Sequence, residues 1–138
     1  MMMEQPAKAL PISLFDYGFD VWIDGNRGTP GNDKHDSLKE GTAEYWAWDM
    51  REMALEDQTA QIAAVLSKSD YEQLAYVGFS LGTRQMMYLM GMAKENDAAA
   101  TAVGSVEKFL ALGPCAYGTS FGIKDETELR DTVSGILQ

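Results

Sequence analysis

The chain has 138 residues, of which 46% are hydrophobic, and it carries 11 basic against 21 acidic side chains, a formal net charge of −10. This length fits a single domain spanning residues 1–138, and the apolar share is sufficient for a packed core. An acidic surface repels phosphate backbones and anionic lipid headgroups. The composition therefore argues against nucleic acid as a partner.

Cys115 is the only cysteine, so no disulfide can form within the chain. No apolar run approaches the roughly 20 residues that a membrane-crossing helix requires, and we expect no transmembrane segment. The first residues, Met1–Pro6, lack the positive and apolar regions of a signal peptide. These features leave the cellular compartment open.

Three short segments rich in β-branched and aromatic residues predict strands: Phe19–Ile23, Gln73–Val77 and Lys108–Leu112. The first is followed by a dense loop signal over Asp24–Asp33. Helical patterns alternate with these segments along the chain. The order β-α-β-α-β-α favours an α/β fold, with a mainly parallel sheet of about three strands and right-handed crossovers.

The three predicted helices each carry an apolar stripe at helical spacing. One begins near Thr42 and runs to Leu66 with a break or bend inside it, one starts directly after Gly82, and one covers Glu128–Leu137. The stripe residues expected to be buried in the first two are Leu55, Thr59, Ile62, Val65, Leu66, Met86, Leu89, Met90 and Ala93.

The motif Gly78-Phe79-Ser80-Leu81-Gly82 lies between the second predicted strand and the helix that follows it. This context is typical of a nucleophile elbow, a strained turn that exposes a reactive serine. Side chains at Gly78 or Gly82 are expected to collide with neighbouring backbone. The pattern predicts Ser80 as a nucleophile and the backbone N–H of Leu81 as an oxyanion donor, with a plain glycine-flanked turn and an inert serine as the alternative.

A serine nucleophile needs an adjacent base, and His35 is the only histidine. It follows the first predicted strand, so its loop opens at the same sheet edge as the elbow. His35 is therefore a candidate base, with an exposed loop histidine as the alternative. Asp24, Asp33 and Asp36 are candidates to orient such a base, or are ordinary turn residues.

Other features of the sequence favour structural roles. The aromatic residues Trp22, Tyr45, Trp46 and Trp48 fit core packing better than a ligand pocket. No cluster of histidine, cysteine and acidic residues has metal-binding spacing, and no glycine-rich loop matches a phosphate cradle. We expect no metal and no cofactor.

Several linked motifs, in the right order, resemble the acid lipases of the gastric and lysosomal type. The similarity runs from about Leu10 to about Tyr117. The family commonly has histidine where this chain has Phe79. The motifs are Tyr17–Ile23, Gly25–Gly28, Lys34–His35, Glu44–Trp48, Glu52–Ala54 with Asp57, Tyr76–Thr83 and Leu110–Pro114.

The resemblance implies an α/β-hydrolase that cleaves acyl esters, including triglycerides and sterol esters, without a cofactor. It implies Ser80 as nucleophile, the Leu81 N–H as oxyanion donor, and secretion or a lysosomal location. The family's His-Gly oxyanion loop would precede the matched region, and its catalytic aspartate, catalytic histidine and lid would follow it. His35 matches a loop histidine of the family, not its catalytic one.

The expected protein is thus one truncated α/β-hydrolase domain without a lid. One interpretation is a serine esterase that prefers short acyl esters, with His35 or a partner chain supplying the base. The alternative is an inactive lipase fragment that serves as an interaction module. Both predict open sheet edges, and therefore a homo-oligomer or a partner chain that covers them.

Overall fold

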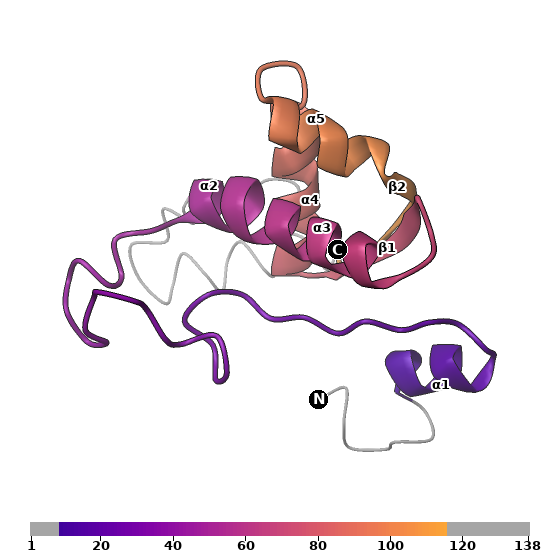
Figure 1. Ribbon diagram of the computed structural model, residues 1–138, viewed down its shortest axis with the longest axis horizontal. Coiled ribbons are helices and arrows are strands. Elements are labelled where there is room, and N and C mark those ends of the chain that lie inside the picture. The colour runs from indigo at the N-terminus through magenta and orange to yellow at the C-terminus, as the bar shows by residue number, and fades with distance from the viewer. Residues whose placement is uncertain (1–8, 116–138) are drawn as a thin grey trace, which may run out of the picture.

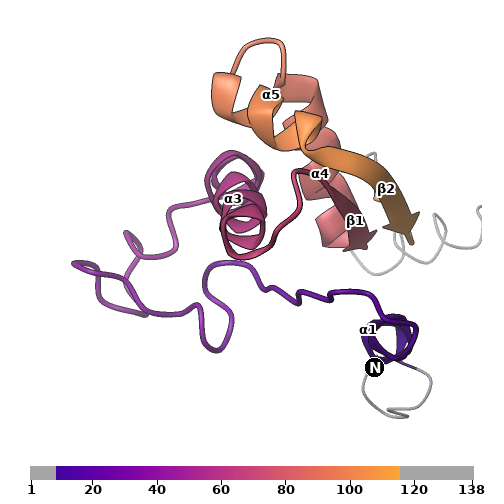
Figure 2. The same cartoon turned by 45° about the vertical axis from the view of Figure 1, so that its right-hand side comes forward.

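The computed structural model describes residues 9–115 (Figure 1). Helices α3, α4 and α5 gather around a small sheet, while α1 and the irregular segment after it run along one side (Figures 1 and 2). The elements in chain order are α1 (Leu10–Asp16), α2 (Met50–Glu52), the π-helical segment η2 (Met53–Gln58), α3 (Thr59–Lys68), β1 (Leu74–Phe79), α4 (Leu81–Met92), α5 (Asp97–Gly104) and β2 (Val106–Leu112).

Strands β1 and β2 pair in parallel, with Leu74 opposite Val106 at one end and Phe79 opposite Leu112 at the other. Parallel neighbours need a crossover connection, which α4 and α5 supply here. The α/β class predicted from the sequence is confirmed. The carboxyl ends of both strands lie at the same edge, where Ser80 begins the turn into α4.

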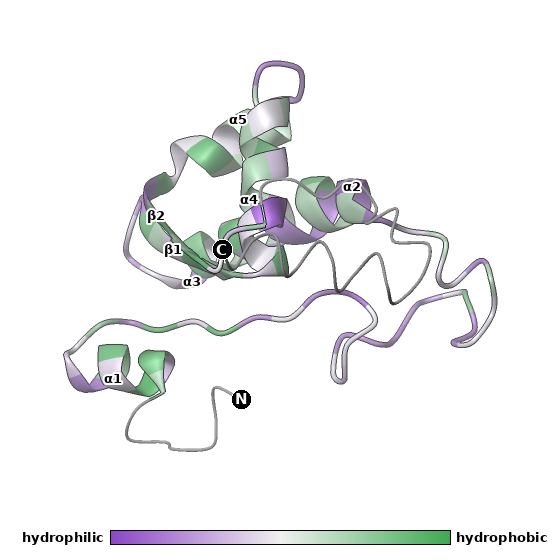
Figure 3. Ribbon diagram, turned by 180° about the vertical axis from the view of Figure 1, so that it is seen from behind, coloured by the Kyte–Doolittle hydropathy of each residue, from purple (hydrophilic) through white to green (hydrophobic). Residues whose placement is uncertain are grey.

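The core is a cluster of five buried residues from α3, α4 and α5, namely Ile62, Met86, Leu89, Ala99 and Ala102. One face of the sheet packs against this cluster through Leu74, Tyr76, Val106 and Phe109. In Figure 3 the strands, α4 and α5 are largely hydrophobic, whereas the segment before α2 is largely hydrophilic. The predicted helix stripes match this core.

Met90 departs from the predicted stripe, because it is 49% exposed although Met86 and Leu89 on the same helix are fully buried. The predicted strand Phe19–Ile23 is also wrong: it is an irregular segment between α1 and the loop that follows. A strand needs a hydrogen-bonded neighbour. None pairs with this segment among residues 9–115, and Phe19, Trp22 and Ile23 are exposed.

The helix predicted from near Thr42 starts at Met50 instead. Asp49 caps it: its carboxylate accepts the N–H of Arg51 at 2.7 Å, and Glu52 Oε2 accepts the N–H of Asp49 at 2.9 Å. Such reciprocal bonds satisfy donors that the first helical turn leaves open. The predicted interruption inside the helix is present as the π-helical segment η2.

Helices α1 and α5 were not predicted. Helix α5 is short and rich in alanine, and its start is marked by Asn96, whose side chain accepts the N–H of Ala99 at 2.9 Å. The helix predicted over Glu128–Leu137 lies outside the described residues. Among the helices described, none has the length and apolar character needed to cross a membrane.

Candidate active site at the β1–α4 turn

Ser80 is the single residue between the end of β1 and the start of α4. Its φ is 49° and its ψ is −108°, and it is the one non-glycine residue with positive φ among residues 9–115. A residue with a Cβ rarely adopts this conformation, which costs about 1 to 3 kcal/mol. Strain at a serine on a strand-to-helix turn is the hallmark of a nucleophile elbow.

The two motif glycines differ in what surrounds them. A Cβ at Gly78 would lie 2.9 Å from the carbonyl carbon of Gly82 and 2.9 Å from the nitrogen of Thr83. Both are backbone atoms that cannot move aside, so only glycine fits here. A Cβ at Gly82 would lie 3.4 Å from the Tyr76 hydroxyl, a milder contact than the expected backbone collision.

Backbone hydrogen bonds hold Ser80 against the neighbouring strand and helix. Its N–H donates to the carbonyl of Leu112 on β2 at 2.9 Å, which extends the sheet pairing by one residue. Its carbonyl accepts the N–H of Thr83 at 3.0 Å. Leu81 is the first residue of α4, and an N–H in the first turn has no acceptor within its helix.

The side chain next to the Ser80 hydroxyl is Cys115. Its Sγ lies 3.7 Å from Ser80 Oγ, and its thiol is free and exposed. Sequence reasoning treated Cys115 only as evidence against disulfides. Its position just after the last predicted strand is the signal that could have placed it near Ser80, because the carboxyl ends of parallel strands meet at one edge of the sheet.

His35 lies exposed in the irregular segment between α1 and α2. Its Nδ1 accepts the backbone N–H groups of Ser37 and Leu38 at 3.1 and 3.0 Å. While these bonds hold, a neutral His35 ring carries its proton on Nε2. Nδ1 could accept a proton from Ser80 only after the loop has released it from these two bonds. No described contact joins His35 to Ser80, and its role as the base stays a prediction.

The three acidic candidates for orienting a base lie in the same segment as His35. Asp24 accepts the N–H of Gly25, and its pKa is raised mainly by burial and further by the nearby Asp57 carboxylate. The backbone carbonyl of Asp33 accepts the Tyr45 hydroxyl at 2.7 Å. Asp36 is exposed. None of their described hydrogen bonds reaches the His35 ring.

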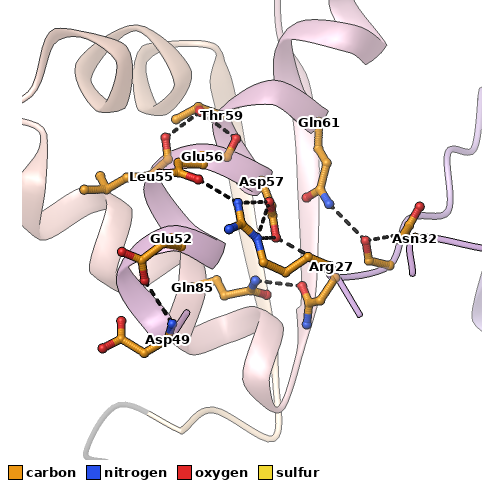
Figure 4. A network of polar contacts seen from close by, with 12 residues as sticks. Arg27, Asn32, Asp49, Glu52, Leu55, Glu56, Asp57, Thr59, Gln61 and Gln85 are labelled. Atoms are coloured by element: carbon orange, nitrogen blue, oxygen red, sulfur yellow. Dashed lines mark hydrogen bonds and ion pairs between the residues drawn. The ribbon is translucent and has the colours of Figure 1, made fainter. Parts of the chain in front are cut away.

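The loop after the segment 19–23 is fastened to the helices by a polar network that sequence reasoning missed (Figure 4). The Arg27 guanidinium binds Asp57 in a fork, with Nε–O distances of 2.9 Å and an Nη2–Oδ1 distance of 2.6 Å. The hydrogen bonds to Asp57 make the largest contribution to raising the pKa of Arg27, and a hydrogen bond to Glu56 raises it further. Gln85 of α4 donates to Asn26 Oδ1 at 2.7 Å, which connects the loop to the helix that starts at the elbow.

The Tyr76 hydroxyl joins η2 to the elbow. It lies 2.8 Å from Gln58 Oε1 and 3.0 Å from the carbonyl oxygen of Gly82. Burial, with a smaller contribution from the Asp24 charge, raises the pKa of Tyr76 to about 12. The phenol is therefore neutral at physiological pH and can donate a hydrogen bond.

The aromatic residues divide between core and surface. Tyr45 is buried, whereas Trp22 and Trp46 are 45% and 48% exposed, so the expectation of core packing is wrong for these two. Trp46 and Trp48 instead cover Gly28, where a Cβ would lie 2.8 Å from the Trp46 ring. Within residues 9–115, no group of three or more histidine, cysteine or acidic side chains is arranged to hold a metal ion.

The chain is similar in sequence to known lipases. It is 28% identical to a probable lipase of Schizosaccharomyces pombe over 123 residues, which is 88% of this chain and 28% of that protein. It is 35% identical to the lipase lipl-3 of Caenorhabditis elegans over 112 residues, 81% of this chain and 26% of that protein. It is 36% identical to the human lysosomal acid lipase/cholesteryl ester hydrolase over 108 residues, 78% of this chain and 26% of that protein.

The chain thus matches little more than a quarter of the length of each of these three relatives. No family model matches it, and no solved structure matches it.

Proposed function

We propose that Ser80 is the nucleophile of a carboxylic-ester hydrolase. The premise is the similarity of this chain to lipases over about a quarter of their length. The observation that carries the proposal is the positive φ of Ser80, 49°, at the junction of β1 and α4. An inert serine gains nothing from this strain. A nucleophile gains an exposed hydroxyl in front of a helix N-terminus.

The reaction follows from this geometry. Ser80 Oγ attacks the ester carbonyl and gives up its proton to a base, supplied by His35 or by another chain. The negative charge on the carbonyl oxygen is stabilised by the Leu81 N–H. The alcohol leaves with a proton, and water then hydrolyses the acyl-serine to release the acid and restore Ser80.

We propose short acyl esters as substrates. The hollow of about 530 Å³ between α3 and α5 is lined largely by apolar residues, but Ser80 is not among them. A long acyl chain gains affinity only where an apolar pocket adjoins the reacting carbon. Binding energy therefore favours small soluble esters.

The test is hydrolysis of p-nitrophenyl butyrate by the purified chain, compared with Ser80→Ala, His35→Ala and a control, Ser67→Ala, on the exposed end of α3. A serine hydrolase that has lost its triad, the serine included, still accelerates the reaction by roughly 10³- to 10⁴-fold over water through oxyanion binding and substrate positioning. We expect a slow, saturable rate above that residual level, which Ser80→Ala lowers by at least about tenfold and Ser67→Ala preserves. If His35→Ala loses the hydrolysis rate, His35 is the base; if it keeps the rate, another group is the base. A rate that Ser80→Ala leaves unchanged would refute the proposal.

A second candidate function is an interaction module, and the outer face of the sheet favours it. Val77 and Leu110 are opposite each other on that face and are 38% and 46% exposed, and Phe79 beside them is 60% exposed. Within residues 9–115, each strand pairs on one side only and presents unpaired backbone groups on the other. Apolar surface next to an open edge promotes pairing with another chain.

Size-exclusion chromatography at micromolar concentration tests this candidate. We expect the wild type to elute as a dimer or larger, because pairing covers the apolar face and an open edge. Leu110→Lys should shift the chain toward a 15.2 kDa monomer. The control is Tyr71→Lys, at an exposed position before β1. A wild-type chain that is wholly monomeric would contradict the expectation.

A further inference from the structure

We propose that Thr83 is a positioning residue that aims the Leu81 N–H at the oxyanion, an assignment that rests on the proposed function of Ser80. Thr83 is fully buried in the first turn of α4, three residues after the nucleophile. It touches no reacting atom in the proposed reaction. Its influence runs through the peptide group between Ser80 and Leu81.

That peptide group is planar, and its carbonyl and N–H point in opposite directions. The carbonyl belongs to Ser80 and the N–H to Leu81. Thr83 donates to the Ser80 carbonyl twice, from its backbone N–H at 3.0 Å and from its hydroxyl Oγ1 at 2.6 Å. Holding the carbonyl at one end of a rigid plane fixes the direction of the N–H at the other end.

The Thr83 hydroxyl is itself oriented by a third bond. It accepts the backbone N–H of Cys115 at 3.0 Å, which comes from the segment after β2. A hydroxyl has one proton to donate. With Cys115 occupying an acceptor position, that proton points to the Ser80 carbonyl. The turn at Ser80 is thus bound to the end of β2 at two points: the Ser80 N–H donates to the Leu112 carbonyl, and the Thr83 hydroxyl accepts the Cys115 N–H.

These hydrogen bonds matter because the strained Ser80 backbone would otherwise rotate toward a conformation of lower energy. If the peptide plane turns, the Leu81 N–H no longer points to where the oxyanion forms. Removing an oxyanion donor outright costs about 10²- to 10³-fold in kcat. Loosening the donor's direction costs less, and we expect a loss of about tenfold in kcat when the hydroxyl is removed.

The experiment compares Thr83→Val and Thr83→Ala, which lack the hydroxyl, with Thr83→Ser, which keeps it. The matched control is Thr101→Val on α5, because the Thr101 hydroxyl also donates to a backbone carbonyl but is exposed and lies in another helix. Circular dichroism and thermal melting check that each variant is folded. The readouts are kcat and KM for p-nitrophenyl butyrate and the inhibition constant of n-butylboronic acid, which forms a tetrahedral adduct with an active serine.

We expect both hydroxyl-free variants to lose kcat and boronic acid affinity by about tenfold with little change in KM, since the oxyanion donor acts mainly in the transition state. Thr83→Ser and Thr101→Val should stay within about twofold of wild type. A hydroxyl-free variant that is folded and fully active would overturn the assignment. So would a Thr83→Ser variant as impaired as Thr83→Val, or misfolding of both hydroxyl-free variants, because Thr83 would then serve packing.

Ser80→Ala in the same series separates the two proposals. If wild type and Ser80→Ala hydrolyse the ester equally, the proposed function fails and the Thr83 assignment fails with it. If Ser80→Ala is inactive while Thr83→Val matches wild type, only the Thr83 assignment fails.

Discussion

Ser80 shows how one residue concentrates strain where chemistry is expected. Its positive φ is sustained by fixed neighbours: Gly78 makes room for the turn, Leu112 binds the Ser80 N–H, and Thr83 binds the Ser80 carbonyl. The strain of about 1 to 3 kcal/mol is offset by these contacts, because the surrounding structure leaves the serine no relaxed alternative. In the proposed account, the Thr83 contact also directs the Leu81 N–H.

Tyr76 gives a prediction for alkaline pH. Its pKa of about 12 in the folded chain exceeds the ordinary value of 10. The unfolded chain therefore releases this proton first, and the folded state holds more protons between those two pH values. Stability that the buried neutral phenol contributes is fully present below pH 10 and falls as pH rises toward 12.

Spectrophotometric titration of the tyrosinates checks this prediction. Tyr76 should titrate near pH 12, and Tyr76→Phe should remove that step and flatten the alkaline loss of stability. Tyr71→Phe is the control, because Tyr71 is 66% exposed. If Tyr76→Phe removes an ordinary step near pH 10 instead, the phenol is not held neutral as described.

At the level of elements, the Arg27 network fixes the loop before α2 onto η2 and α4. The Arg27 side chain is 28% exposed and that of Asp57 is 14% exposed, whereas the side chain of the second partner, Glu56, is 64% exposed. A partly buried fork is worth more than a solvated contact, because removing one partner leaves an uncompensated charge. The two acidic neighbours therefore differ in their expected contribution to stability.

Asp57→Asn should lower the free energy of unfolding by about 1 to 2 kcal/mol, a value reduced from the fully buried case because Arg27 keeps some solvent. Glu56→Gln, the same chemical change one residue earlier, should stay within about 0.5 kcal/mol of wild type. Urea unfolding followed by circular dichroism measures both. Equal effects of the two substitutions would show that burial of the Arg27–Asp57 pair carries no weight.

The elements that the sequence predicts correctly are those whose signal is local. Strands β1 and β2 and helix α4 follow from short apolar runs and the glycines beside Ser80. Phe19–Ile23 has an equally strong strand pattern, yet pairing depends on a neighbour that no local pattern reports. The start at Met50 was readable from Asp49 and Glu52, three residues apart, but the apolar pattern outweighed that capping signal.

The site was predictable in part for the same reason. Ser80, Gly78 and Leu81 are neighbours in sequence, so their geometry follows from one motif. Cys115 and Thr83 meet across 32 residues, and Arg27 meets Asp57 across 30, contacts that only the fold brings together. Thr83 stands next to the motif, but nothing in the sequence shows that its hydroxyl binds back to Ser80.

For the molecule as a whole, the chain carries the strained turn at Ser80 and the helices around it, and it matches about a quarter of the length of its lipase relatives. Among the described residues the sheet has two strands, with one face packed and the other open, and the net charge of the full chain is −10. Charge repulsion opposes association while the exposed apolar face favours it, so self-association should strengthen with added salt, which screens the charge.

The most direct test of the central claim is covalent labelling with a fluorophosphonate, an ester analogue that phosphonylates activated serines. The purified chain is treated with the probe, and the modified residue is located by peptide mass spectrometry. We predict one adduct per chain, on Ser80, which is absent from Ser80→Ala and lost when the protein is unfolded in urea beforehand. Absence of any adduct, or labelling that persists in Ser80→Ala, would contradict the account of Ser80 as an activated nucleophile.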